Sequence, residues 1–134
     1  MIKKIDHIAI AVKDLEKEIK RYREILGLEY LGREIVEEQK VEVAFFRVGN
    51  VLLELTTPTA EDSPVHNFLK KREGGIHHIS FEVENIETKI EEFEKKGVVM
   101  LNREPKAGAH KAKIAFAHPK SFSGVLLELK EKEE

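Results

Sequence analysis

An internal repeat constrains the fold of this chain more than any other feature of its sequence. Asp6–Val12 matches His77–Val83, and the residues that follow each segment continue the match in the same register. Further along, Val51–Leu55 recurs letter for letter as Val125–Leu129, with a few more residues between the two matches in the second copy. Repeated segments in the same order indicate a duplicated supersecondary unit, with a loop insertion in the second copy.

Each copy is predicted to contain a strand, a helix and then three strands. Apolar residues alternate in the strand segments, and each helix segment carries one apolar face. Asp14 and Asn85 are expected to cap the two helices, which should end at Gly27 and Gly97. The predicted strands are Ile5–Val12, Glu29–Val36, Val41–Val48 and Val51–Thr56, then Ile76–Val83, Val98–Arg103, Ala112–Ala117 and Val125–Leu129.

The predicted fold class is α+β, with tandem βαβββ modules in a single domain that spans residues 1–134. The modules cover about residues 5–56 and 76–130. The linker, residues 57–75, contains Ser63-Pro64, which is typical of a helix start, and we expect a short helix from there to about Arg72.

Composition excludes several classes of protein. The chain has no cysteine, which removes disulfides, thiolate metal sites and cysteine nucleophiles. Its 23 basic and 25 acidic residues nearly balance, which argues against a nucleic-acid partner. No apolar run is long enough for a membrane span, and no signal-peptide core follows Met1, so we expect a cytoplasmic protein without a membrane partner. The many Lys and Glu residues are typical of heat-adapted proteins, a weak indication of a thermophilic source.

Four residues stand at matching places in the two copies. His7 and His78 occupy the first strands, and Glu54 and Glu128 interrupt the otherwise apolar Val-Leu-Leu-x-Leu runs. Taken singly, each would be read as a satisfied polar residue or an edge residue. As a set, two imidazoles and two carboxylates suit a divalent transition metal, because a buried carboxylate needs a cation or another partner.

Other polar residues are not included in this set. His77 should point to the face opposite His78, since neighbouring strand residues alternate. The C-terminal tail from Lys130 is expected to be a solvated end.

These motifs resemble those of the vicinal oxygen chelate superfamily, which includes glyoxalase I, extradiol dioxygenases and antibiotic-resistance proteins. Within it, five segments together are similar to the methylmalonyl-CoA epimerase family: Asp6–Val12, Glu61–Pro64, Gly74–Ile79, Gly108–His110 and His118–Ser121. The resemblance implies a curved mixed β-sheet that forms a cleft, and interconversion of (2R)- and (2S)-methylmalonyl-CoA by movement of the C2 proton.

The resemblance also implies the parts of the site. His7, His78 and Glu128 match the family's metal-binding positions, and Glu54 stands where some members have a fourth ligand. The implied metal is divalent, with Co²⁺ as the first candidate and Mn²⁺, Zn²⁺ or Ni²⁺ as alternatives. Glu38 and Glu128 are the candidate acid/base residues, with Glu37 as an alternative to Glu38. Glu54 could instead fill one of the two roles of Glu128, as metal ligand or as base.

The implied partners are a CoA-thioester substrate and a second copy of the chain in a homodimer. Lys111, Lys113 and Lys120 could face the CoA phosphates.

Two other functions stay open at this point. One is a different metal-dependent enzyme of the superfamily, a glyoxalase-like isomerase or a dioxygenase, because two His and a carboxylate also bind non-haem iron. The other is a metal-free small-molecule-binding protein on the same fold.

Overall fold

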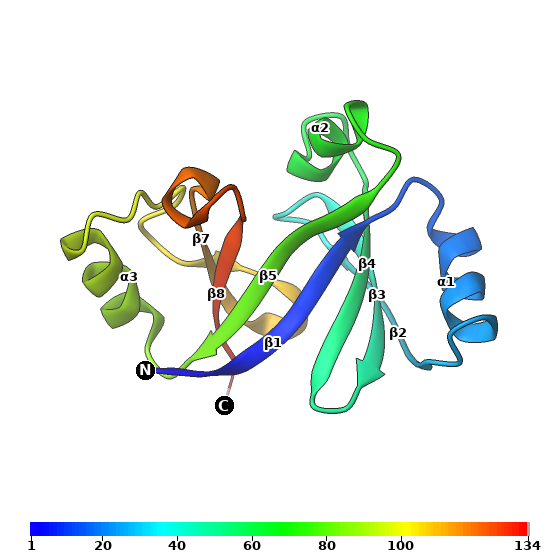
Figure 1. Cartoon of the computed structure of the whole chain (residues 1–134), viewed down its shortest axis with the longest axis horizontal. Coiled ribbons are helices and arrows are strands. Elements are labelled where there is room, and N and C mark those ends of the chain that lie inside the picture. The colour runs from blue at the N-terminus through cyan, green and yellow to red at the C-terminus, as the bar shows by residue number, and fades with distance from the viewer. Residues whose placement is uncertain (134) are drawn as a thin grey trace. The chain divides into compact units, whose positions relative to one another are not determined.

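The repeated order of elements is present in the computed structural model, which describes residues 1–133 (Figure 1). The chain divides into two units: His7–His77 forms the first unit, and Met1–Asp6 with the chain from His78 onward forms the second unit. The elements are β1 (Ile2–Ala11), α1 (Leu15–Glu24), β2 (Glu29–Val36), β3 (Val41–Val48), β4 (Val51–Pro58), α2 (Pro64–Lys70), β5 (Gly75–Val83), α3 (Ile86–Lys95), β6 (Lys106–Ala107), η1 (Ala109–Lys111), β7 (Lys113–Ala117), η2 (Pro119–Phe122) and β8 (Leu127–Glu131).

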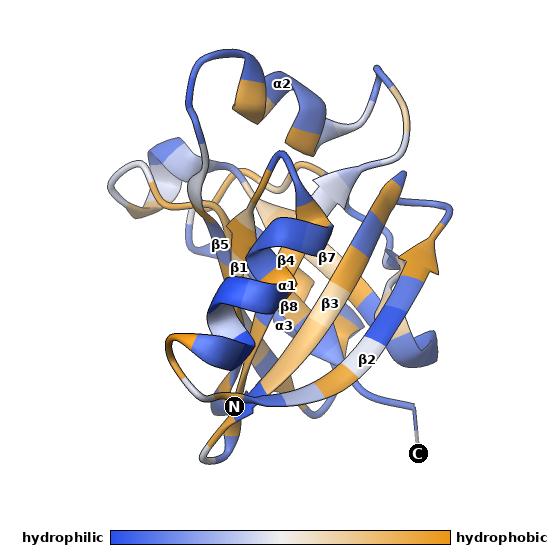
Figure 2. Cartoon of the chain, turned by 90° about the vertical axis from the view of Figure 1, so that its right-hand side faces the viewer, coloured by the Kyte–Doolittle hydropathy of each residue, from blue (hydrophilic) through white to orange (hydrophobic). Residues whose placement is uncertain are grey.

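The first unit contains a four-stranded mixed sheet in the order β2-β3-β4-β1. β1 and β4 are parallel, whereas β3 runs antiparallel to both β2 and β4. The predicted cap of α1 is confirmed, since the Asp14 side chain accepts a hydrogen bond from the Lys17 N–H at 3.1 Å. Apolar residues of α1 pack with Phe46 and Leu55, and the outward surface of the helix is hydrophilic (Figure 2).

The second unit repeats this arrangement with the strand order β5-β8-β7-β6. β5 and β8 are parallel and the remaining pairs are antiparallel. Asn85 caps α3 by accepting a hydrogen bond from the Thr88 N–H at 2.9 Å. Ile86 and Ile90 of α3 pack with Leu129 in a second core. The predicted α+β class and the βαβββ order are therefore confirmed.

The predicted strand Val98–Arg103 is wrong. Only Met100 makes an isolated bridge there, to Ala117, and the short strand β6 begins at Lys106. The cause is Asn102, whose side chain occupies the edge of β7. Its Oδ1 accepts from the Phe116 N–H at 2.9 Å, and its Nδ2 donates to the Ile114 carbonyl at 3.4 Å. Before Asn102 the backbone still bonds to β7 and the residue after it: the Leu101 N–H donates to the Phe116 carbonyl, and the Val99 carbonyl accepts from the His118 N–H. At Asn102 the amide side chain makes these bonds in place of a paired backbone.

The end of the chain also differs from expectation. β8 begins at Leu127 rather than at Val125, because Val125 closes a turn by donating its N–H to the Phe122 carbonyl. The strand continues through Lys130, and the predicted solvated tail therefore does not begin there. Lys130 is buried and its Nζ lies 2.8 Å from the Asp6 carboxylate, which is also buried.

The linker carries the predicted short helix. Ser63 caps α2 by accepting from the Val65 N–H at 3.2 Å, and Pro64 takes the first helical position. The helix ends at Lys70, slightly before the predicted Arg72. Among the residues described, no helix combines the length and the apolar character that a membrane crossing requires.

Leu55 and Leu129 provide a test of the duplicated core, because they are equivalent in the repeat and both are fully buried. We expect Leu55→Ala and Leu129→Ala each to lower the free energy of unfolding by about 2–5 kcal/mol, since each leaves a cavity. Urea denaturation of the metal-free protein measures the change. Leu26→Ala is the control, because Leu26 is 57% exposed and its truncation should cost far less. Equal small losses for all three variants would contradict the assignment of two cores.

Candidate functional site

The first unit contains a buried His–Glu pair. His7 lies in β1 and Glu54 in the parallel strand β4, and each is 4% exposed. The register places Glu54 beside Ala9, two residues after His7, so both polar side chains lie on the same face. The His7 Nδ1 atom is 3.2 Å from the Glu54 Oε2 atom. Leu53 and Leu55 pack in the core on the opposite face, which leaves Glu54 directed to the face of His7.

The second unit contains the equivalent pair at the equivalent register. His78 lies in β5 and Glu128 in the parallel strand β8, and Glu128 is beside Ser80, two residues after His78. The His78 Nε2 atom is 3.8 Å from the Glu128 Oε2 atom. Phe116 supports the imidazole edge-on, with ring centroids 5.3 Å apart and an interplanar angle of 83°.

The chemistry of the two pairs fits a divalent cation. A distance of 3.8 Å is too long for a hydrogen bond, so His78 and Glu128 face each other without bonding through these two atoms. Both carboxylates are taken out of water, which is costly unless a cation or a strong donor lies beside them. Imidazole nitrogen and carboxylate oxygen are the ligands that zinc, cobalt and manganese accept in proteins. Each unit therefore supplies two donors of the predicted set.

The ring of His77 has different surroundings from the ring of its neighbour His78. Its ring packs edge-on against Phe68 of α2, with centroids 5.1 Å apart. Burial lowers the pKa of His77 to about 4, because the charged imidazolium would lose its hydration. His77 is therefore neutral at pH 7.

Glu38 lies in the turn between β2 and β3 and is exposed. Backbone hydrogen bonds hold this turn: the Lys40 N–H donates to the Glu37 carbonyl, and the Thr59 N–H donates to the Lys40 carbonyl. The Lys40 ammonium also forms an ion pair with Asp62. The turn that carries Glu38 is thus tied to the segment after β4, the strand of Glu54.

The lysines considered for the CoA phosphates have different surroundings. Lys113 forms ion pairs with Glu87 at 3.2 Å and with Glu131 at 4.0 Å, so its charge is already compensated. Lys111 follows His110 in a loop where both residues have positive φ angles, near +60° and +56°. Lys120 lies in η2, and its backbone N–H donates to the His118 Nδ1 atom at 3.0 Å.

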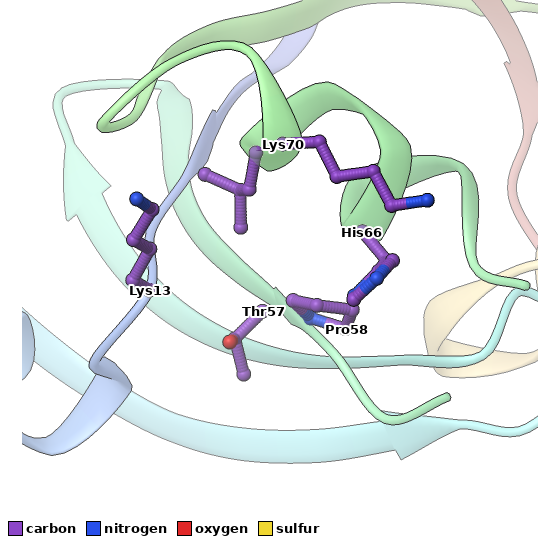
Figure 3. A pocket seen from close by; sticks show the side chains of 6 residues that line it. Lys13, Thr57, Pro58, His66 and Lys70 are labelled. Carbon is purple, nitrogen blue, oxygen red and sulfur yellow. The ribbon is translucent and has the colours of Figure 1, made fainter. Parts of the chain in front are cut away.

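A separate hollow of about 280 Å³ lies in the first unit between α2 and the ends of β1 and β4 (Figure 3). It has an apolar floor and a basic rim. The residues that line it are Lys13, Thr57, Pro58, His66, Leu69 and Lys70. Lys13 also lies 3.3 Å from Glu73, so the positive charge at this end of the hollow is partly compensated.

An ionic network in the second unit was missed by the sequence reasoning. Asp6 accepts from Lys130 at 2.8 Å and lies 3.4 Å from Lys132, which in turn lies 3.2 Å from Glu82. The signal that could have revealed it is the position of Lys130, two residues after Glu128 on the same face of a strand. The ion pair links β8, the strand that carries Glu128, to Asp6 of β1.

Comparison with known proteins identifies the family of this chain. The model of the glyoxalase/bleomycin resistance protein/dioxygenase superfamily matches residues 6–116. The chain belongs to this superfamily. The superfamily and the βαβββ fold that the sequence motifs predicted are therefore confirmed.

Individual relatives in the superfamily are similar over nearly the whole chain. The human mitochondrial methylmalonyl-CoA epimerase is 42% identical over 96% of this chain and 73% of its own length. The ethylmalonyl-CoA/methylmalonyl-CoA epimerase of Cereibacter sphaeroides is 41% identical over 98% of this chain and 99% of its own. A solved structure of the Streptomyces coelicolor methylmalonyl-CoA epimerase is also similar, with a TM-score of 0.95 at 36% identity, covering 100% of both chains. That structure is of a variant with one glutamate replaced by glutamine, in complex with 2-nitronate-propionyl-CoA.

Metal binding by the His–Glu pairs can be measured directly. We expect His7→Ala and His78→Ala each to lose most of the divalent metal that the wild-type chain retains, because each removes one imidazole donor. The measurement is elemental analysis after loading with Co²⁺ and extensive dialysis. His66→Ala is the control, since His66 lies in the hollow and not in either pair. Full metal retention by both variants would reject these residues as ligands.

Proposed function

We propose that this protein is a methylmalonyl-CoA epimerase that moves the C2 proton of a CoA-thioester substrate with the help of a bound divalent metal. The observation that carries the proposal is the similarity to enzymes of that name over almost the entire chain, in sequence and in structure. The two buried His–Glu pairs support it, because they provide donors for a metal in a protein without cysteine.

The proposed metal ligands are His7, Glu54, His78 and Glu128. When bound there, a divalent cation would supply Lewis acidity, which stabilises negative charge on a substrate carbonyl oxygen. Co²⁺ is the proposed ion, with Mn²⁺, Zn²⁺ and Ni²⁺ as the alternatives to compare by reconstitution of the metal-free protein. The imidazoles must be neutral to bind a metal, because the ligand nitrogen must be free of its proton.

The proposed acid/base residues are Glu38 and Glu128. Epimerisation needs one group on each face of the planar enolate, so that one group removes the C2 proton and the other returns it. Glu38 is suited to proton exchange because it is exposed on a turn that the Lys40–Asp62 ion pair and two backbone hydrogen bonds hold in place. Glu128 is the proposed acid/base group on the other face of the enolate. It is buried beside His78, which keeps its carboxylate away from bulk water.

Deuterium exchange tests the proton transfer. In heavy water the wild-type chain should exchange the C2 proton of both epimers of methylmalonyl-CoA. Glu38→Gln should slow this exchange by about 10²- to 10⁴-fold for the epimer whose proton faces Glu38, because the amide cannot accept the proton. Metal content should be unchanged in this variant. The reaction can be followed by mass spectrometry, with and without a chelator.

Glu37→Gln is the matched control, since Glu37 is the exposed neighbour in the same turn. If Glu37→Gln stops the exchange and Glu38→Gln does not, the base is Glu37. If the metal-loaded wild-type chain exchanges no deuterium, the epimerase proposal is wrong. Oxygen consumption with a catechol would instead favour a dioxygenase of the same superfamily.

The proposed assembly is a homodimer, to be measured by light scattering of the full chain during size-exclusion chromatography. The proposed thermophilic origin would be contradicted by a melting temperature in the ordinary mesophile range. Both measurements are independent of the assignment of activity.

A further inference from the structure

One buried hydroxyl in the second unit is not used by the fold or by the proposed reaction. Ser80 lies in the middle of β5 and is fully buried, at 0% exposure. Its Oγ atom has no hydrogen-bond partner within residues 1–133. A buried hydroxyl without a partner is unfavourable, so its presence requires a reason outside the folding of the chain.

The position of Ser80 places it at the second His–Glu pair. Ser80 follows His78 by two residues and therefore shares its face of β5. In the parallel pairing of β5 and β8, its register partner is Glu128. The unpartnered hydroxyl thus lies beside the carboxylate that we propose as a metal ligand.

The repeat supplies an internal comparison. The residue equivalent to Ser80 in the first unit is Ala9, which is also at 0% exposure and is the register partner of Glu54. The same strand, at the same register and beside an equivalent glutamate, therefore folds with a methyl group in place of the hydroxyl. The fold therefore does not need a polar atom at this position. Glu128 has a hydroxyl donor at its register partner, whereas Glu54 has only a methyl group.

We propose that Ser80 is a positioning residue for Glu128: its hydroxyl donates a hydrogen bond to the Glu128 carboxylate when that carboxylate binds the divalent metal. This inference rests on the proposed function for the presence of a metal. A donor to one carboxylate oxygen directs the other oxygen to the metal. Glu54 has no such donor at its register partner, because Ala9 has no hydroxyl. We therefore expect the Glu128 carboxylate to be held in a more fixed orientation than the Glu54 carboxylate.

Ser80→Ala tests this assignment with two readouts that do not depend on turnover. The full chain, stripped of metal, should unfold at the same temperature as the wild type or at a higher one, because the variant removes a buried hydroxyl without a partner. Its dissociation constant for Co²⁺, measured by calorimetry at fixed pH, should rise about 10- to 100-fold. The visible absorption spectrum of the Co²⁺ form should also change, since the orientation of one ligand is altered.

Ala9→Ser is the matched control. It places a hydroxyl at the equivalent position beside Glu54, so by the same argument it should not weaken Co²⁺ binding. The proposal is overturned if Ser80→Ala binds Co²⁺ as tightly as the wild type with the same spectrum. It is also overturned if the metal-free variant unfolds at a clearly lower temperature, because the hydroxyl would then serve the fold.

The outcomes separate this inference from the proposed function. A wild-type chain that binds no divalent metal overturns both. A wild-type chain that binds Co²⁺ but exchanges no C2 proton overturns only the epimerase assignment, and the affinities of Ser80→Ala and Ala9→Ser still decide the role of Ser80.

Discussion

Burial of a carboxylate inside an apolar strand is the constraint on which the rest of this structure depends. Glu54 and Glu128 each stand between two leucines whose side chains pack in a core on the opposite face. Neither glutamate can turn to water without pulling a leucine out of its core, so the negative charge stays where the strand places it. Removing an ion from water costs several kcal/mol unless a partner compensates. In both units a histidine on the neighbouring parallel strand lies beside the carboxylate, and the proposed metal would supply the compensating positive charge.

Duplication explains why so small a chain can hold this many buried polar groups. Each unit has its own helix, its own four strands and its own core, so each fixes one His–Glu pair by local register. Equivalent positions are then free to diverge without changing the fold. Ala9 and Ser80 show such a divergence beside equivalent glutamates, and Thr56 and Lys130 show another, where a neutral residue in one copy corresponds to a buried cation in the other.

The sequence was sufficient for the elements that periodicity and repetition describe. The caps at Asp14, Asn85 and Ser63 and most of the strands follow from local rules, and the pairing of each histidine with a glutamate follows from the repeat. The failures arise where a side chain takes part in backbone hydrogen bonding or where a charge is buried. Asn102 replaces a strand at the edge of β7, and Lys130 is buried against Asp6, which lies far away in sequence. Propensity and composition contain no information on such long-range partners.

Asn102 also introduces a chemical weakness at the edge of β7. Its amide both accepts from the Phe116 N–H and donates to the Ile114 and Glu104 carbonyls. Spontaneous deamidation to aspartate would keep the acceptor but replace the donor with a negatively charged oxygen, which would face two carbonyl oxygens. The edge of the second sheet would then open by repulsion, although no catalytic or core residue had changed. For a chain whose Lys- and Glu-rich composition is typical of heat-adapted proteins, deamidation at Asn102 would be a chemical form of damage that is separate from thermal unfolding.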